Sequence, residues 1–498
     1  MSADEGVATP MPPSGVHGRV IRKNISVVSL AYVIGSICGF VALAYMARQL
    51  GNATFGVFVA ASALVNIVGV IDTLGGGNYL VREIGRDPRR IEELLGDVLI
   101  LRIGAGLVTI LVSVVAAAAL GFDSTEMLIV AIVALMAGAN AVSKTLRAGL
   151  QAWERMDVAS AISIGNAVLS AAGMVAVIAA GGGLVGAVAV STVVSFATIP
   201  VSWVSLRRLV EVKVKPAWGA VKSVIKASMP FAVAGVLTFG TTYVDTLVLR
   251  GFLGDQQTGL YGAAVRVQQV LLAIPSVYLD SVYRTISHLS AIGVKALGEF
   301  VDRSAAWLCL AALPFAAGGL VIGGRILTLI FGSEYAAATP ALKILLLSLV
   351  FEFPSWVLMP AVTIDRPATG AKIVGVAFVL NLGLNILLVP SFGILAAAWL
   401  TLAAGAFTTV VPTIILARRG MTVRWPLFAL PGVAVAAVMA LAVYPLRNSP
   451  LIVPLAVGAV VYVGGLVLTG VPARLGLRWS SVRRLLRRRS DVEDAAER

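Results

Sequence analysis

Long apolar runs separated by short polar segments dominate the pattern of this chain. Most runs come close to the 20 or so apolar residues that a helix needs to cross the hydrocarbon core of a bilayer. A spanning segment must satisfy its backbone hydrogen bonds internally, so the runs are expected to be helices. The pattern predicts an all-α polytopic membrane protein with about 14 transmembrane helices. Their expected ranges are 25–47, 56–74, 97–120, 127–143, 158–180, 184–205, 229–250, 259–283, 304–330, 341–363, 371–389, 393–416, 427–446 and 451–470.

The basic residues occur preferentially at alternate ends of these runs. There are 39 Lys and Arg residues and 25 Asp and Glu residues, which gives a formal net charge of +14 at pH 7. Cytoplasmic loops of membrane proteins are enriched in Lys and Arg. Placing both termini in the cytoplasm puts most basic residues on inward segments, which predicts this orientation of the chain. The alternation argues against a nucleic-acid partner, because such binding requires a basic patch on one surface.

Composition excludes several classes of protein. Only 13% of the residues are charged and 58% are hydrophobic, whereas a soluble enzyme is about 25% charged. Cys38 and Cys309 both lie inside apolar runs, which excludes a disulfide framework. His17 and His288 have no companions at ligand spacing, so no metal site is predicted. The chain has no G-x-x-x-x-G-K-[ST] motif, so we expect neither an ATP-driven pump nor a cofactor.

Two segments outside the spans are both basic and amphipathic. Residues 207–228 carry Lys and Arg around Trp218 and Val221, and the C-terminal tail carries Arg around Trp479 and Val482. Helices of this kind lie on anionic lipid surfaces, so lipids of the inner leaflet are a predicted partner. For the tail, an interfacial helix and a solvated basic end remain equally open alternatives.

The turn after the first apolar run recurs after the seventh. Residues 50–58 and 253–261 both read L-G-x-x-x-x-G-x-aromatic, and segments 183–187 and 393–397 form a second such pair. Repeats at nearly one offset indicate a duplication of six helices in the same orientation. The sequence therefore predicts two pseudo-symmetric six-helix bundles followed by two C-terminal helices. The expected segments are a disordered cytoplasmic N-terminus (1–24), an N-lobe (25–206), a cytoplasmic amphipathic linker (207–228), a C-lobe (229–417), helices 13 and 14 (427–470) and a basic tail (471–498).

Several motifs resemble, in their order and spacing, those of one transporter family. They are ARQLG at 47–51, DTLG at 72–75, VREI at 81–84, RAGLQAWERM at 147–156, Asp245 with L-G at 253–254 and G-L-Y at 259–261, and NLGLN at 381–385 with Pro390 and Gly393. Over roughly residues 20–420 the chain is similar to the Wzx-like oligosaccharide flippases of the multidrug/oligosaccharidyl-lipid/polysaccharide exporter superfamily. The resemblance implies translocation of a polyprenyl-pyrophosphate-linked glycan from the inner to the outer leaflet of the inner, cytoplasmic membrane, alongside glycosyltransferases and a polymerase of the same pathway.

An ionisable residue inside a spanning helix is costly and is therefore a candidate functional residue. Arg266, Gln269, Asp280 and Arg284 share one face of the eighth predicted helix. Arg266 has no charged partner on its own helix, so we expect it to face the phosphates of the substrate, with Gln269 beside it. Asp280 and Arg284 lie one turn apart near the cytoplasmic end, where a local salt bridge is favoured over a role in a gate.

Two carboxylates are the candidates for ion coupling. Asp245 in the seventh predicted helix has no basic residue one turn away. It is either a proton- or sodium-coupling group or the counter-ion of Arg266, and both arrangements lower the cost of burial. Glu352 lies in the middle of the tenth predicted helix, where it is either a second coupling carboxylate or a hydrogen-bonded structural residue.

Three further residues are candidates for binding substrate. Arg48 and Arg250 lie at the outer ends of the first and seventh predicted helices. They either flank the mouth of a cavity or extend to the membrane interface. Asn385 is expected to form hydrogen bonds between helices, and it could also contact sugar.

The cytoplasmic ends of the first bundle hold a second polar group. Asp72 and Arg102 could pair at the inner ends of the second and third predicted helices. Arg147 lies on a polar stripe at the inner end of the fourth. These residues are candidates for a cytoplasmic gate or for the surface through which the substrate enters. For the polar stripe that contains Arg147, the alternative is a helix end that is simply solvated.

The sequence thus favours an ion-coupled flippase that works by alternating access, and no enzymatic activity is expected. A drug or cation antiporter of the same superfamily is the first alternative, and it predicts a cavity rich in carboxylates and aromatic side chains, whereas Arg266 would repel a cationic drug. A membrane glycan polymerase or ligase is a weaker alternative. Its acid and base groups need a large outward loop, and segments 181–183, 254–259 and 390–393 are too short for one.

Overall fold

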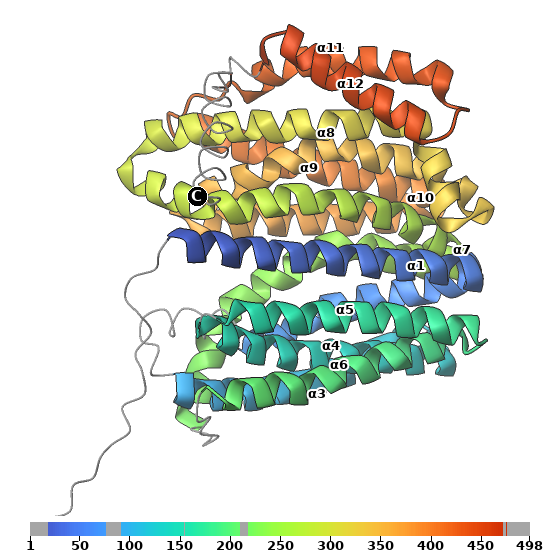
Figure 1. Cartoon of the computed structure of the whole chain (residues 1–498), viewed down its shortest axis with the longest axis vertical. Coiled ribbons are helices and arrows are strands. Elements are labelled where there is room, and N and C mark those ends of the chain that lie inside the picture. Colours follow the sequence, from blue (N-terminus) through green and yellow to red (C-terminus); the bar gives the residue numbers. More distant parts are fainter. Residues whose placement is uncertain (1–17, 76–90, 154, 210–217, 472–474, 476–498) are drawn as a thin grey trace, which may run out of the picture. The chain divides into compact units, whose positions relative to one another are not determined.

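The described part of the chain consists of helices joined by short turns (Figure 1). The computed structural model describes residues 18–75, 91–153, 155–209, 218–471 and 475. No β-strand occurs among these residues, and the expected all-α fold is confirmed. The elements are α1 (Gly18–Val68), η1 (Gly69–Gly75), α3 (Ile91–Ala119), α4 (Ser124–Ala152), α5 (Met156–Ala179), α6 (Gly183–Arg207), α7 (Trp218–Ile292), α8 (Val294–Phe331), η3 (Ser333–Ala338), α9 (Thr339–Thr363), α10 (Pro367–Arg418), α11 (Trp425–Val443), η4 (Tyr444–Leu446) and α12 (Ile452–Leu468).

Ten helical stretches of the described chain are long and apolar enough to cross a membrane. Three of them, Val33–Asp72, Ala232–Ile292 and Pro367–Arg418, have 40, 61 and 52 residues. Each of the three is long enough for two crossings, since about 20 residues span the hydrocarbon core. The shorter apolar helix Ile452–Leu468 completes the set. Each span expected from the sequence overlaps one of these stretches, and the chain is a multi-pass membrane protein.

Each of the three long stretches is interrupted at one glycine. Gly51 in α1 and Gly254 in α7 have nearly the same backbone angles, with φ of 78° and 76°, and Gly393 in α10 has φ of 64°. Positive φ values of this kind are accessible to glycine at little steric cost. Gly51 and Gly254 are the corresponding glycines of the sequence repeat. The repeat is therefore also a repeat of backbone conformation.

The N-terminal boundary differs from the expectation. Helix α1 begins at Gly18, inside the segment 1–24 that the sequence predicts to be disordered. The basic residues in this stretch do not break a helix, because Lys and Arg have high helix propensity. Residues 1–17 and most of the predicted basic tail, 471–498, lie outside the described residues.

The chain divides into two compact units. The first contains α1 up to Gln49 and the chain from Leu64 to Val236, and the second contains Leu50–Ala63 and the chain from Leu237 onward. The segment Leu50–Ala63 of α1 therefore belongs to the second unit, although the sequence assigns it to the N-lobe. The lobe boundaries given above stay a prediction. Part of the 207–228 linker also lies outside the described residues.

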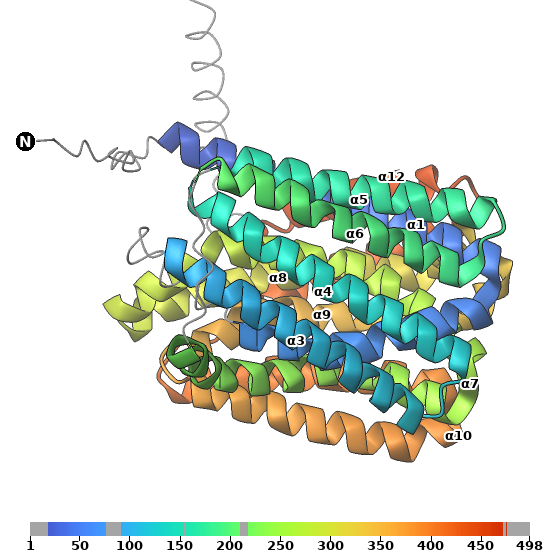
Figure 2. The same cartoon turned by 90° about the horizontal axis from the view of Figure 1, so that it is seen from below.

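In the first unit, α4 packs against α3, α5 and α6 (Figure 2). Leucine side chains that are almost completely buried form the core between these helices, among them Leu95, Leu146, Leu150 and Leu206. Trp203 packs against this cluster from α6. Between helices in a membrane, such side chains contribute mainly through close van der Waals packing, so the cluster joins α3, α4, α5 and α6.

In the second unit, α9 packs against α8 on one side and α10 on the other, and α11 lies against α8. Phe55 from the α1 segment is fully buried, and its ring centroid lies 6.2 Å from the centroids of both Phe331 and Tyr335. The Tyr462 hydroxyl on α12 donates to the Leu310 carbonyl on α8 at 2.6 Å. These contacts attach the α1 segment and the two C-terminal helices to the same unit.

Two glycines let α1 and α7 touch backbone to backbone inside the second unit. A Cβ atom placed on Gly56 would lie 1.8 Å from the Asp255 carbonyl oxygen, and one on Gly259 would lie 1.9 Å from the Asn52 carbonyl oxygen. The contact is reciprocal, because Asn52 and Gly56 occupy the same repeat positions as Asp255 and Gly259. Small residues permit such close helix crossings in membranes.

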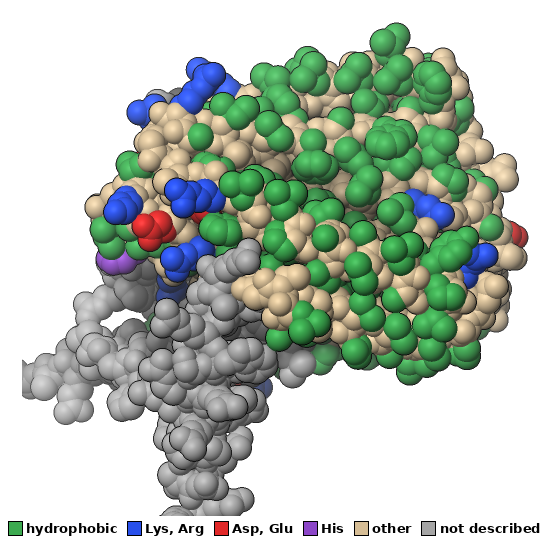
Figure 3. Space-filling view, turned by 90° about the horizontal axis from the view of Figure 1, so that it is seen from above, with side chains coloured by type: hydrophobic (Ala, Val, Ile, Leu, Met, Phe, Trp, Pro, Cys, Tyr) green, Lys and Arg blue, Asp and Glu red, His purple; other side chains and the backbone are tan. Residues whose placement is uncertain are grey.

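Large apolar side chains are exposed on most of the long helices, including Leu107 on α3, Leu387 on α10 and Leu441 on α11, whereas α9 exposes none. Hydrophobic side chains cover much of the face shown in Figure 3. A soluble monomer rarely exposes so much contiguous apolar surface. The exposed surface is suited to lipid.

Candidate functional site

A polar cavity of about 420 Å³ lies inside the second unit, among α7, α9 and α10. No Lys or Arg occurs among its lining residues. The polar ones lie one or two turns apart on each helix, so they share a face that points into the cavity. The lining consists of Thr238, Thr241, Thr242, Asp245, Tyr261, Val265, Gln268, Gln269, Leu272, Glu352, Ser355, Trp356, Met359, Val374, Ala377, Thr401, Ala404, Gly405 and Thr408.

Asp245 forms part of the α7 wall and is only 5% exposed. Its Oδ2 accepts a hydrogen bond from the Tyr261 hydroxyl at 2.5 Å. Its Oδ1 accepts from the backbone N–H of Thr246 at 2.7 Å. The Tyr261 hydroxyl in turn lies 3.1 Å from Thr401 Oγ1 on α10. Both carboxylate oxygens therefore have donors, which offset much of the cost of burying the group and fix its orientation.

Glu352 faces the same cavity from α9. Its Oε1 accepts from Ser348 Oγ at 2.7 Å and from Gln268 Nε2 at 2.8 Å. Gln268 Nε2 also donates to Ser348 Oγ at 2.9 Å, which links α7 to α9. Oε2 makes no hydrogen bond to any described residue, so its lone pairs are available to a ligand. The structure thus brings together the two carboxylates that the sequence singles out for ion coupling, and their role stays a prediction.

Arg266 lies beside the cavity and is not part of its lining. Its Nη1 donates to Gln269 Oε1 at 3.0 Å, and Gln269 does line the cavity. No ion pair joins Arg266 to Asp245 in the described part of the chain. The counter-ion interpretation of Asp245 is therefore corrected, because hydroxyl and amide donors meet its oxygens instead.

The other three candidates for substrate binding lie away from the cavity lining. Arg48 is exposed. Arg250 Nε is 2.9 Å from Asp255 Oδ1, so its guanidinium is ion-paired. Asn385 is fully buried, and its Nδ2 donates to Asn381 on the same helix, at 2.8 Å to the carbonyl oxygen and 3.0 Å to Oδ1. Asn385 therefore bonds within α10 and not, as expected, to another helix. A role in substrate binding stays a prediction for Arg48, Arg250 and Asn385.

The candidate gate residues of the first unit connect neighbouring helices. Arg102 and Asp72 do meet, but through the backbone, since Arg102 Nη1 donates to the Asp72 carbonyl oxygen at 2.6 Å. Arg102 Nε also donates to Thr145 Oγ1 at 3.1 Å, which ties α3 to α4. Arg147 Nη1 donates to Ser163 Oγ at 2.9 Å, which ties α4 to α5. A gating role for this group stays a prediction.

Asp280 and Arg284 are both exposed on α7. The structure forms no ion pair between them in the described chain, so the favoured local salt bridge is absent there. Exposed pairs at this spacing gain only about 0.3–0.5 kcal/mol, so solvation of the separate charges competes effectively.

Sequence reasoning does not identify Tyr261, Gln268 or Trp356 as site residues. Tyr261 stands out only as the aromatic position of the repeat, yet its hydroxyl holds Asp245. The sequence does contain a pattern that could have identified the site, because polar residues recur at i, i+3, i+4 and i+7 in two apolar helices. These stripes are 238, 241, 242 and 245 in α7, and 352, 355, 356 and 359 in α9, where Met359 is the apolar member.

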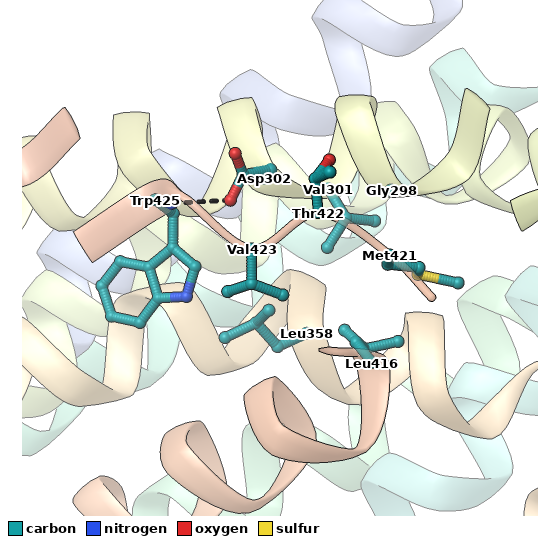
Figure 4. Close-up of a pocket in the computed structure, with 9 residues that line it drawn as sticks. All are labelled: Gly298, Val301, Asp302, Leu358, Leu416, Met421, Thr422, Val423 and Trp425. Carbon is teal, nitrogen blue, oxygen red and sulfur yellow. Dashed lines mark hydrogen bonds between the residues drawn. The ribbon is translucent and has the colours of Figure 1, made fainter. Parts of the chain in front are cut away.

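A second, small pocket lies where α11 begins (Figure 4). Asp302 on α8 points at this helix start, and its Oδ1 accepts the backbone N–H groups of Arg424 at 2.7 Å and Trp425 at 2.6 Å. Leu358 and Leu416 close the other side. A carboxylate in this position satisfies N–H groups that have no partner within the helix and is favoured by the helix dipole. The pocket thus belongs to the attachment of α11.

The described residues hold no group of three or more His, Cys, Asp or Glu side chains that could bind a metal ion. In the polar cavity, the carboxylates of Asp245 and Glu352 accept hydrogen bonds from hydroxyl, amide and backbone N–H groups.

Comparison with known sequences shows to which family the chain belongs and identifies a related protein. The family model for polysaccharide biosynthesis proteins matches residues 21–289. The chain is 23% identical over 387 residues to a probable low-salt glycan biosynthesis flippase, Agl15, of Haloferax volcanii. That alignment covers 77% of this chain and 80% of the relative.

Comparison with solved structures gives the same fold. The lipid II flippase MurJ, in an inward closed conformation, superposes with a TM-score of 0.71 at 13% identity, covering 89% of this chain and 98% of MurJ. A multidrug resistance MATE family transporter of the MOP superfamily, in an inward-facing conformation, gives 0.63 at 14% identity, covering 77% and 94%. At these identities the likeness shows the fold alone.

Proposed function

The chain belongs to the polysaccharide biosynthesis protein family, and from that premise we propose that it translocates a polyprenyl-pyrophosphate-linked oligosaccharide across the cytoplasmic membrane. Transport proceeds by alternating access of the two compact units. No bond is made or broken, so the activity is not enzymatic and needs no cofactor. The likeness to a probable glycan biosynthesis flippase supports this proposal.

The polar cavity of the second unit is the observation that carries the proposal. A sugar and a pyrophosphate must pass about 30 Å of hydrocarbon, whereas the polyprenyl chain can remain in it. Unpaired polar groups cost several kcal/mol in that medium. A cavity of about 420 Å³ lined by hydroxyl, amide and carboxylate groups supplies partners for a hydrophilic headgroup within otherwise apolar helices.

Arg266 is the proposed partner of the pyrophosphate. Its guanidinium carries five N–H donors in a planar fork that suits phosphate oxygens. In the described structure one of its nitrogens bonds to Gln269, and this bond places the cation at the edge of the cavity. A buried cation is costly without a counter-charge, so an anionic substrate would lower the cost of keeping Arg266 within the membrane.

Asp245 and Glu352 are the proposed ion-coupling groups. Both line the cavity, and Glu352 Oε2 is free of partners among the described residues. A proton or sodium ion bound there would neutralise negative charge next to the substrate. Release of that ion would then bias the units toward the other conformation.

One observation favours a drug or cation antiporter as the second candidate. The cavity lining contains two carboxylates and Trp356 but neither Lys nor Arg. Carboxylates and an aromatic ring suit an organic cation, because the ring face attracts positive charge. The likeness to a multidrug MATE family transporter concerns the fold and does not decide between the two.

The proposal is tested with the purified full chain in proteoliposomes. Lipid-linked glycan is placed in one leaflet, and its appearance in the other is measured by binding of a membrane-impermeant lectin. Arg266→Ala should abolish translocation, Arg266→Lys should retain part of it, and Arg418→Ala, at an exposed arginine on α10, should behave as wild type. Wild-type translocation by Arg266→Ala would remove Arg266 from the mechanism. Uptake of a cationic dye with no translocation of glycan would establish the antiporter instead.

A further inference from the structure

The cavity described above has the chemistry of a sugar site. We infer that it binds the sugar next to the pyrophosphate, and that Glu352 makes it select neutral sugars over acidic ones. This inference rests on the proposed function and adds to it a class of headgroup and a residue that sets the specificity.

The size of the cavity favours a sugar over an ion alone. A water molecule takes up about 30 Å³ in the liquid, and a dehydrated ion needs similar space. The cavity volume of about 420 Å³ is more than ten times larger. It lies within the range of about 300–1,000 Å³ that is usual for sites of small organic ligands.

The free hydrogen-bonding groups of the cavity match sugar hydroxyls. Glu352 Oε2 is an acceptor without a described partner. Gln269 uses its Oε1 to accept from Arg266, which leaves its NH₂ group as a donor. Thr242 and Ser355 add hydroxyls, whose own protons go to backbone carbonyls of Thr238 and Glu352, so their lone pairs remain available. A hydroxyl both donates and accepts, so it can bond to groups of either kind.

Trp356 supplies the apolar part of the site. It is half-buried and lies one turn from Glu352 on α9, so the indole and the carboxylate line the same wall. A pyranose ring has an apolar face of C–H groups, which can lie on an aromatic ring while its hydroxyls point to the polar groups. An indole is suited to this position because it combines a large apolar surface with one polar N–H.

The charges explain the preference for neutral sugars. Asp245 and Glu352 both line the cavity, and none of the lining residues is Lys or Arg. When no proton or sodium ion is bound to the two carboxylates, the carboxylate of an acidic sugar meets like charges and no cation that could neutralise it, so its binding is disfavoured. Arg266 lies outside the lining, where it remains for the pyrophosphate, and its bond to Gln269 places the two subsites side by side.

Binding of free glycosides tests the inference apart from transport. The purified full chain in detergent is titrated with methyl glucoside and with methyl glucuronoside, and the change in tryptophan fluorescence that disappears in Trp356→Phe is measured. The neutral glycoside should bind at least about tenfold more tightly. Glu352→Gln keeps the shape of the side chain and should reduce the ratio to about threefold or less, whereas Glu299→Gln, at an exposed carboxylate on α8, should leave it unchanged.

Several results would overturn the inference. They are equal binding of the two glycosides by the wild type, an unchanged ratio in Glu352→Gln, or a fluorescence response to sodium ions with none to either glycoside. If Glu352→Gln does not fold, Gln269→Ala replaces it and should weaken binding of the neutral glycoside. Selective glycoside binding without translocation in proteoliposomes would refute the proposed function alone, and translocation without selectivity would refute this inference alone.

Discussion

The backbone contact between Gly56 and Gly259 leads to a strong prediction about stability. Alanine at either position would place a Cβ atom within 2 Å of a backbone carbonyl oxygen, at 1.8 Å for Gly56 and 1.9 Å for Gly259. Real Cβ atoms essentially never approach closer than 3.0 Å, so the two helices must separate by about 1 Å. The obstructing oxygens belong to the backbone and cannot rotate aside as a side chain could.

The expected loss follows from this displacement. Overpacking of a well-packed core costs about 1–3 kcal/mol, and Gly259→Ala should fall in the upper half of that range. The separation would also loosen Phe55, which is buried against Phe331 and Tyr335. We therefore expect a clear decrease in the Tm of the purified protein in detergent, measured by differential scanning fluorimetry.

A control and a double variant make this test specific. Gly383 lies on α10 with no atom within 4 Å of the position of a Cβ, so Gly383→Ala should be neutral or stabilising, by up to about 1 kcal/mol from helix propensity. Gly56→Ala and Gly259→Ala push the same helices apart, so the double variant should lose less than the sum of the two losses. Wild-type Tm values for the single variants, or strictly additive losses, would refute the reciprocal contact.

Three further predictions concern the helix ends and the attached helices. Asp302→Ala removes the acceptor of two backbone N–H groups at the start of α11 and should cost about 1–3 kcal/mol, whereas Asp302→Asn keeps an acceptor oxygen and should lower the Tm less. Tyr462→Phe removes the hydroxyl that bonds α12 to α8 and should cost about 1 kcal/mol, and an unchanged Tm would argue against that bond. Arg250→Ala removes one partner of the ion pair with Asp255, whose side chains are only 9% and 27% exposed, so it should lower the Tm by more than the loss of about 0.2–1 kcal/mol typical of an exposed pair, and high salt should change the difference little.

The family of the chain and its helices could be predicted from the sequence. The spans depend mainly on local composition, because any sufficiently long apolar segment must be helical in lipid. The positive-φ glycines were also foreseeable in part, since Gly51 and Gly254 occupy the same position of a repeat. Arg266, Asp245 and Glu352 stand out as costly residues within apolar runs. These inferences need only the order of residues along one helix or around one turn.

The arrangement of the site could not be predicted in the same way. The stripe that ends at Asp245 and the stripe that begins at Glu352 are separated by more than a hundred residues, and Thr401 lies on yet another helix. Periodicity shows which residues share a face, but it does not show which faces meet. The sequence alone therefore left Arg266 as a plausible counter-ion of Asp245, where the structure places Tyr261.

Hydropathy and motif order are local properties of the chain, so they suffice to identify a multi-pass helical membrane protein of a polysaccharide biosynthesis family. The three-dimensional packing is needed to show that Asp245 and Glu352 line one cavity and that Arg266 lies at its edge. It is also needed to show that Gly56 and Gly259 bring the backbones of two helices into contact. These facts depend on packing between helices distant in sequence. The free energy of such packing comes from many weak contacts, which no single segment of the chain encodes.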